Sequence, residues 1–182
     1  NSFAKDTNLK NESIIFENIK FKYFDSDEDI FENLNLKIPL NKHTIITGPN
    51  GSGKSTLIGL MCGVLHPSSG KIITNSDRFG YVGAQPMILN DTLINNIMYG
   101  NSSPNTKEEI VGYIRQFKLF ESIDEEVLNK KISNKSLSSG QMQKISFIRA
   151  LANNVEILIL DEATANLDSE TKDLIYSVIN NL

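Results

Sequence analysis

Apolar and polar residues alternate along the chain with two different periods, and each period predicts one kind of secondary structure. Alternation with a period of two predicts strands, because successive side chains of a strand point to opposite faces. We expect strands at 14–24, 34–38, 43–48, 71–74, 78–82 and 155–160. Apolar residues spaced three and four apart predict helices. We expect helices at 54–65, 92–98, 107–120 and 123–131, from Ser139 onward, and at 169–182.

The distribution of these elements predicts the domain organisation. Residues 1–13 are polar, and we expect a linker or a disordered end there. Strands and helices alternate over 14–85 and 145–182, which predicts an α/β core, and we expect an antiparallel β part near its N-terminus. Residues 86–144 carry mainly helical patterns, so we expect a helical subdomain. The run "VEILIL" in the last predicted strand is apolar on both faces, as a central strand of a parallel sheet requires.

Composition narrows the class of protein. A chain of 182 residues can bury one good core, and 40% hydrophobic with 22% charged residues is typical of soluble globular domains. A net charge of −4 argues against nucleic acid as the main partner, since no basic surplus neutralises phosphates. No apolar run approaches the roughly 18 residues that a membrane-spanning helix needs. The single Cys62 cannot form an internal disulfide, and the start at Asn1 indicates a processed chain or a piece of a longer one.

A glycine-rich segment between a predicted strand and a predicted helix carries the clearest chemistry. The segment "GPNGSGKST" fits G-x-x-x-x-G-K-[ST], the pattern of a loop whose backbone N–H groups converge on phosphates. We expect Lys54 to neutralise the β- and γ-phosphates and Ser55 to offer its hydroxyl to Mg²⁺. The candidate nucleotide-binding residues of this segment are Gly48, Pro49, Asn50, Gly51, Ser52, Gly53, Lys54, Ser55 and Thr56.

Two acidic residues follow the predicted strand 155–160. The carboxyl end of such a strand is where ligands bind in open α/β sheets. We expect Asp161 to hold Mg²⁺ together with Ser55, and Glu162 to be the catalytic residue that polarises the attacking water. Acids after a strand also commonly cap helices, so this interpretation depends on the phosphate loop upstream.

A second candidate anion site lies in "SLSSGQMQK", at residues 136–144, where small hydroxyl residues and a glycine precede an apolar helical stripe. The first N–H groups of a helix and its dipole attract negative charge. The candidate phosphate contacts are Ser138, Ser139, Gly140 and Gln141. An ordinary capped helix is the alternative interpretation.

These motifs resemble a known family. The phosphate loop, then "LSSGQ", then "ILILDE", in that order and at short spacing, are similar to the nucleotide-binding domain of ABC transporters, and the resemblance runs from Phe16 to Leu182. It implies a P-loop NTPase with a RecA-like mixed sheet, and ATP and Mg²⁺ as cofactors. In that family two domains pack head to tail, each ATP lying between one phosphate loop and the signature helix of the other copy. A two-fold pair satisfies both anion sites, so the resemblance implies a second nucleotide-binding domain as partner, as in a homodimer.

The resemblance extends to further positions. Tyr23 stands where an aromatic residue stacks on adenine, although as a strand residue it could equally belong to the core. Asp168 matches the carboxylate of the loop that crosses the dimer interface. The stretch "PMILNDTLINNI" resembles exporters, which implies ATP hydrolysis that powers transport, a membrane domain fused upstream, and a place at the cytoplasmic face of a bacterial inner membrane.

The sequence departs from the family pattern at a few positions. The family's glutamine is expected at Ala84, and Gln85 stands one residue later, so either the loop shifts to present Gln85 to Mg²⁺ or this contact is absent. Ser139 replaces the usual glycine, which a small hydroxyl should tolerate. The family's switch histidine lies beyond Leu182, so we expect a truncated C-terminal end and a piece that binds ATP better than it hydrolyses it.

Two other functions use the same motifs. One is a soluble ABC ATPase that acts on DNA or ribosomes, but the segment between phosphate loop and signature leaves no room for a long coiled coil. The other is a purely regulatory nucleotide-binding module. Lys54, Asp161 and Glu162 are all present and argue against it, whereas Ala84 weakly favours it. Lipid, oligosaccharide, peptide and drug all stay open as the transported substrate, because the membrane domain selects it.

Overall fold

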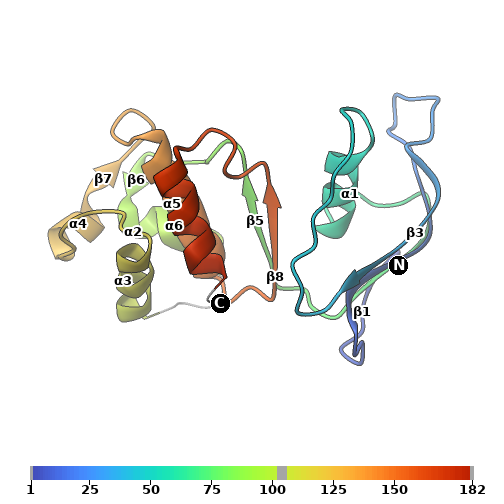
Figure 1. Cartoon of the computed structure of the whole chain (residues 1–182), viewed down its shortest axis with the longest axis horizontal. Coiled ribbons are helices and arrows are strands. Elements are labelled where there is room, and N and C mark those ends of the chain that lie inside the picture. Colours follow the sequence, from blue (N-terminus) through green and yellow to red (C-terminus); the bar gives the residue numbers. More distant parts are fainter. Residues whose placement is uncertain (1, 102–105, 181–182) are drawn as a thin grey trace. The chain divides into compact units, whose positions relative to one another are not determined.

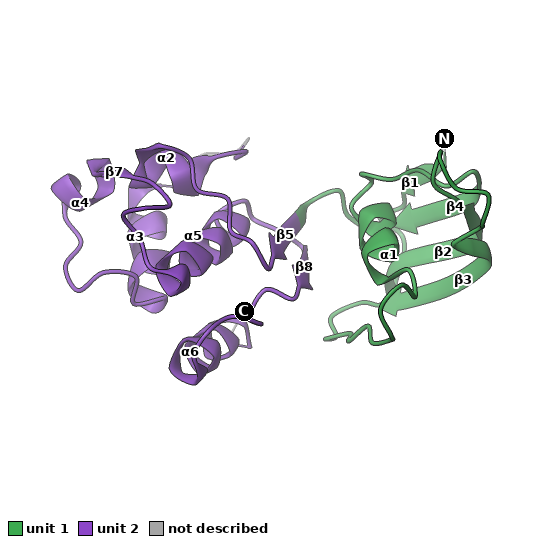
Figure 2. Cartoon of the chain, turned by 90° about the horizontal axis from the view of Figure 1, so that it is seen from above, with its two compact units in different colours: residues 1–79 green, residues 80–182 purple. Residues whose placement is uncertain are grey.

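The computed structural model describes residues 2–101 and 106–180 (Figure 1). It forms two compact units, Asn1–Phe79 and Gly80–Leu182, coloured separately in Figure 2. No helix in the described ranges is both long and apolar enough to cross a lipid bilayer.

Unit 1 is built on a four-stranded sheet with the order β1-β4-β2-β3. The strands are β1 (Phe3–Lys5), β2 (Glu12–Phe21), β3 (Phe31–Pro39) and β4 (Ser69–Thr74). The central strand β2 runs antiparallel to both neighbours, so that Phe16 lies opposite Leu36 on one side and Ile72 on the other. Helix α1 (Lys54–Met61) belongs to the same unit and contributes Leu57 and Leu60 to the buried residues (Figure 2).

The β2–β4 ladder contains a bulge that depends on one glycine. The register of β2 shifts beyond Glu17, and Asn18 adopts a left-handed backbone with φ 51°. Gly70 of β4 has φ 90°, and a Cβ atom there would lie 2.4 Å from the Asn18 carbonyl oxygen. Only glycine permits this approach.

Two expectations for unit 1 are wrong. Residues 3–5 lie within the segment expected to be a linker or disordered, yet Phe3 pairs with Ile72 in a parallel ladder. The local pattern could not show this because the partner strand is remote in sequence. The segment 43–48 is not a strand, and Ile45 is 86% exposed. A strand needs a ladder partner, and none of the described residues pairs with this segment.

Unit 2 contains two small sheets and five helices in its described part. Strand β5 (Phe79–Gly83) pairs with β8 (Ile157–Asp161), and β6 (Asp91–Thr92) pairs antiparallel with β7 (Lys131–Ile132). The helices are α2 (Leu93–Met98), α3 (Lys107–Gln116), α4 (Glu125–Asn129), α5 (Ser139–Leu151) and α6 (Ser169–Ile179). The predicted helices are therefore present, with shorter ends. The predicted end at 181–182 lies outside the described residues.

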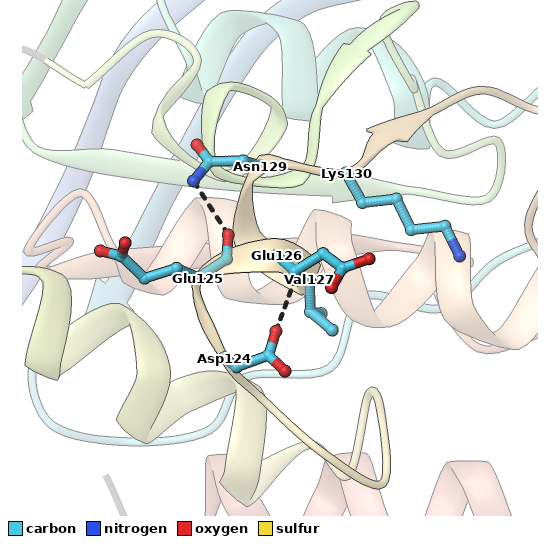
Figure 3. A pocket seen from close by; sticks show the side chains of 6 residues that line it. All are labelled: Asp124, Glu125, Glu126, Val127, Asn129 and Lys130. Carbon is cyan, nitrogen blue, oxygen red and sulfur yellow. Dashed lines mark hydrogen bonds between the residues drawn. The ribbon is translucent and has the colours of Figure 1, made fainter.

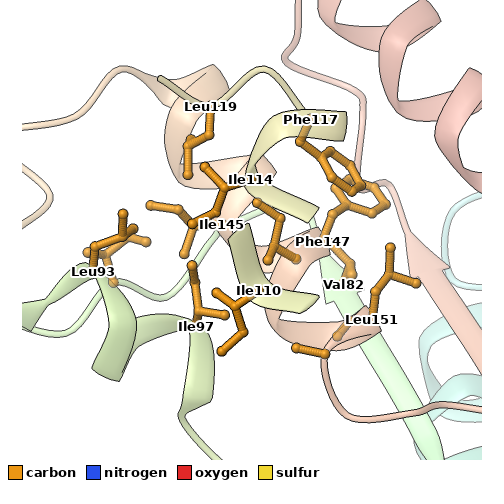
Figure 4. Close-up of a cluster of buried hydrophobic side chains, with 14 of the residues drawn as sticks. Val82, Leu93, Ile97, Ile110, Ile114, Phe117, Leu119, Ile145, Phe147 and Leu151 are labelled. Carbon is orange, nitrogen blue, oxygen red and sulfur yellow. The ribbon is translucent and has the colours of Figure 1, made fainter. Parts of the chain in front are cut away.

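Helix α5 lies in the main hydrophobic cluster of unit 2 (Figure 4). Its residues Ile145, Phe147 and Ile148 are fully buried, and they pack in one cluster with Ile110 and Ile114 of α3. The rings of Phe117 and Phe147 stack with centroids 6.1 Å apart. Side chains packed on this scale fix the axis of α5, and with it the position of the signature residues at its N-terminus.

Candidate functional site

The phosphate loop of unit 1 has the backbone that its glycines predict. Gly51 and Gly53 have φ 81° and 86°, a region that other residues rarely adopt. A Cβ atom at Gly53 would also lie 2.9 Å from the Phe31 ring, so a side chain at this position would be strained and would displace that ring. Gly53 precedes α1 without a side-chain cap. The first N–H groups of α1 therefore have no side-chain partner at the cap and can donate to an anion.

Lys54 bends back over this loop. Its ammonium nitrogen donates to the carbonyl oxygens of Gly48 at 2.9 Å and Pro49 at 2.8 Å. These two bonds hold a positive charge inside the loop, next to the N-terminus of α1. A bound phosphate would find both a cation and backbone donors here.

Tyr23 lies beside the start of α1 within unit 1. Its hydroxyl shares a hydrogen bond of 2.9 Å with Thr56 Oγ1, and Thr56 is buried. Its ring meets Phe21 edge to face at 5.0 Å, and the side chain remains 43% exposed. Tyr23 is therefore attached to α1 while much of it faces solvent. This excludes the core interpretation and leaves the residue accessible to a planar base.

In unit 2 the two acidic residues lie at the end of β8: Asp161 is the last residue of the strand, and Glu162 follows it. Asp161 Oδ2 accepts a hydrogen bond of 3.1 Å from the Tyr81 hydroxyl of β5. Glu162 is exposed and adopts a left-handed backbone with φ 51°. A glutamate in this region carries backbone strain, and such strain concentrates at functional sites. The chain therefore turns sharply at the residue predicted to be catalytic.

The signature residues begin α5 as a capping box. The Ser138 hydroxyl oxygen accepts from the Gln141 N–H at 3.1 Å, and Gln141 Oε1 accepts from the Ser138 N–H at 3.0 Å. The helix cap that the alternative interpretation predicts is therefore present. Capping does not exclude anion binding, because a serine hydroxyl that accepts one bond still has a proton to donate.

Two other predicted positions lie on loops of unit 2. Asp168 caps α6, accepting from the Thr171 N–H at 2.8 Å and from its hydroxyl at 2.9 Å. These bonds hold the pKa of Asp168 below its ordinary value of 3.8, and the bond from the Thr171 backbone N–H has the larger effect. Gln85 is exposed in the turn that follows β5. The predicted nucleotide contacts of both residues stay predictions.

The donor chemistry fits magnesium better than a transition metal. In the ranges that the structure describes, no group of three or more His, Cys, Asp or Glu side chains could form a protein cage for a metal. The expected ligands are a serine hydroxyl and one carboxylate. Mg²⁺ prefers such hard oxygen donors and completes its shell with water and phosphate oxygens.

Two residues of unit 2 that form hydrogen bonds at the ends of β5 and β8 were not identified from the sequence. Tyr81 was assigned only to a strand, and Gln143 only to a helix. Gln143 is 2% exposed and donates to the Gly83 carbonyl oxygen at 2.9 Å. A polar residue on the buried side of an amphipathic helix is a signal that could have pointed to Gln143.

A surface pocket at α4 contains none of the predicted site residues (Figure 3). It is lined by Asp124, Glu125, Glu126, Val127, Asn129 and Lys130. Asp124 caps α4 through the Val127 N–H, and Asn129 donates to the Glu125 carbonyl oxygen, so these bonds serve the helix itself. We assign no function to this pocket.

Comparison with known families decides the identity. Residues 31–165 match the family model described as ABC transporter, a range that includes the phosphate loop, the signature and both acids. The chain belongs to the ABC transporter family. The predicted family and the P-loop NTPase fold class are thereby confirmed, and the chain corresponds to an exporter-type ABC ATPase domain.

Individual ABC proteins agree with this assignment. The chain is 33% identical to the ABC multidrug transporter mdr4 of Aspergillus fumigatus, over 93% of this chain and 14% of that protein. It is 32% identical to the ATP-dependent lipid A-core flippase of Haemophilus influenzae, over 92% of this chain and 31% of that protein. The structure of a bacterial Atm1-family ABC exporter with ATP bound matches with a TM-score of 0.82 and 26% identity, over 100% of this chain and 34% of the exporter. The chain therefore spans about a third or less of these proteins.

Proposed function

We propose that this domain binds ATP with Mg²⁺ and hydrolyses it to power an exporter-type ABC transporter, and that ATP joins two domains head to tail. The observation that carries the proposal is the phosphate loop, in which Lys54 and the uncapped start of α1 converge. The relatives named as a transporter and a flippase support the coupling to transport.

The residues take the following roles in this proposal. The N–H groups of the phosphate loop and Lys54 bind the β- and γ-phosphates, and Tyr23 stacks on the adenine. Ser55 and Asp161 are the protein ligands of Mg²⁺, which when bound neutralises charge on the phosphates. Glu162 accepts a hydrogen bond from the attacking water and orients it toward the γ-phosphorus.

The signature residues serve a second copy of the domain. Ser138 donates its hydroxyl proton to the γ-phosphate held by the partner's loop, and the N–H groups of Ser139 and Gly140 add the attraction of a helix start. Gln141 acts through the capping box that orients Ser138. Asp168 faces the same interface, and Gln85 extends toward Mg²⁺. One nucleotide thus contacts two copies, and its hydrolysis weakens their association.

The organisation follows from the same assignment. Residues 14–85 and 145–182 form the nucleotide-binding core, and 86–144 form the helical subdomain that meets the membrane domain. That membrane domain belongs to the same exporter, and the ATPase domain works at the cytoplasmic face of the membrane. The chemistry of the transported substrate is set by the membrane domain.

A substitution that preserves shape while blocking water activation tests the proposal. In a chain extended beyond Leu182 to include the family's switch histidine, with Mg²⁺ and saturating ATP, Glu162→Gln should accumulate as a dimer in light scattering, since a neutral amide polarises the attacking water less than a carboxylate does. The unmodified chain should return to monomer as ATP is consumed, and Lys54→Ala should not dimerise. Glu170→Gln, the same replacement at an exposed position of α6, is the matched control. Glu162→Gln that stays monomeric at saturating ATP would refute ATP-dependent dimerisation.

A further inference from the structure

We propose that Tyr81 is a positioning residue for Asp161, holding one carboxylate oxygen by a hydrogen bond so that the other oxygen faces Mg²⁺. This inference rests on the proposed role of Asp161 as a magnesium ligand. It concerns a residue outside the phosphate loop, the signature and the acidic pair.

The two side chains come from neighbouring strands. Tyr81 lies in β5 and Asp161 ends β8, and these strands pair within unit 2. The phenol oxygen lies 3.1 Å from Asp161 Oδ2. Because the bond uses Oδ2, Asp161 keeps Oδ1 for another ligand. A neutral phenol donor orients the carboxylate without adding a competing cation.

The strand leaves a place for the Tyr81 ring. Residues 81 and 83 lie on the same face of β5, since side chains alternate along a strand. Position 83 is glycine, and a Cβ atom there would lie 2.9 Å from the Tyr81 oxygen and 3.2 Å and 3.3 Å from two ring carbons. The ring therefore lies over the backbone of Gly83, and a side chain at this position would push the phenol away from Asp161.

Gly83 is also held by a hydrogen bond from helix α5. Its carbonyl oxygen accepts the 2.9 Å bond from Gln143, whose side chain is 2% exposed. The end of β5 is thus held by a buried donor on the signature helix. Tyr81 itself is 52% exposed, so its phenol oxygen is positioned by the backbone of Gly83 beneath the ring and by the bond to Asp161.

Outer-shell hydrogen bonds of this kind tune a metal site. They orient the ligand, and their loss typically costs 10–100-fold in metal affinity or activity. Tyr81→Phe removes the phenol oxygen and keeps the ring. It should therefore weaken the contribution of Mg²⁺ without changing the affinity for nucleotide alone.

The experiment follows binding of a fluorescent ATP analogue to the 182-residue chain, once in EDTA and once across a Mg²⁺ titration. We expect the Mg²⁺ concentration at half-maximal effect to rise about 10-fold in Tyr81→Phe, with binding in EDTA unchanged. Tyr113→Phe, which removes a phenol oxygen on α3, should match the unmodified chain. An unchanged Mg²⁺ requirement in Tyr81→Phe would overturn the inference, as would an equal loss of binding in EDTA.

A second variant tests the place of the ring independently. Gly83→Ala should raise the Mg²⁺ requirement as Tyr81→Phe does, and the change should vanish in a Tyr81→Ala background, where no ring remains to be displaced. An equal effect of Gly83→Ala in both backgrounds contradicts a role through Tyr81.

Asp161→Ala distinguishes failure of the proposed function, in which Asp161 is a Mg²⁺ ligand, from failure of the positioning role of Tyr81. If this variant leaves the Mg²⁺ dependence intact, Asp161 is not a magnesium ligand and the proposed function itself fails at this residue. If it abolishes the dependence while Tyr81→Phe has no effect, only the positioning role is lost.

Discussion

Ser138 combines two roles that suitable substitutions can separate: the cap of α5 and a proposed contact with the partner's γ-phosphate. Ser138→Ala removes the 3.1 Å bond from the Gln141 N–H and leaves that donor without its cap. Loss of an N-cap hydroxyl costs about 1 kcal/mol, which corresponds to a drop of about 2–4 °C in Tm for a domain of this size.

Ser138→Asp should behave in the opposite way. A carboxylate caps as well as a hydroxyl, and its charge at the helix N-terminus contributes about 0.3–1 kcal/mol of further stabilisation. The same charge would repel a phosphate of the partner's ATP. We therefore expect Ser138→Asp to keep or raise Tm while it abolishes the ATP-dependent dimer of Glu162→Gln.

Thermal unfolding followed by circular dichroism, together with light scattering in Mg²⁺ and ATP, measures both effects. Ser139→Ala, one position into α5, is the control for stability because Ser138 supplies the cap. Two results contradict the reasoning: an unchanged Tm in Ser138→Ala, and a Ser138→Asp variant that dimerises with ATP as well as its parent.

Three further predictions concern Tyr23, Gln143 and Asp168. Tyr23→Phe keeps a stacking ring and should retain ATP affinity, whereas Tyr23→Ala should lose about 1–3 kcal/mol of binding free energy by titration calorimetry; equal affinities of the two variants would exclude stacking. Gln143→Leu leaves the Gly83 carbonyl oxygen without this donor and should cost about 1–3 kcal/mol in urea unfolding, with Gln116→Leu at an exposed position of α3 as the matched control; a cost no greater than that of the control counts against the buried bond. Because Thr171 lowers the pKa of Asp168, its stabilisation is present above the ordinary value of 3.8 and is lost as pH falls through the lowered pKa. Asp168→Asn should therefore flatten the loss of stability that urea titrations record as pH falls below 3.8, and an unchanged pH dependence would contradict this.

Local patterns predicted the elements and the motifs because the information lies within a few residues. The period of two placed β2, and the spacing of Ser138 and Gln141 forms a capping box that sequence alone displays. The glycines of the phosphate loop have the left-handed backbone that their pattern requires at Gly51 and Gly53.

Contacts between remote residues could not be predicted in this way. Tyr81 and Asp161 are 80 positions apart, and Gln143 and Gly83 are 60 apart. These contacts depend on which strands and helices lie next to each other in the fold. A single sequence does not show which remote segments become neighbours. The pairing of Phe3 with Ile72 was missed for the same reason.

Cross-linking between two copies tests the shared nucleotide most directly. In a Cys62→Ala, Glu162→Gln background, one sample carries Asn50→Cys in its phosphate loop and a second carries Ser139→Cys in its signature. When the two are mixed with Mg²⁺ and ATP under mild oxidation, we expect a disulfide between unlike copies that disappears without nucleotide. The same yield with and without ATP, or cross-links only between like copies, would contradict a nucleotide clamped between the phosphate loop of one domain and the signature of another.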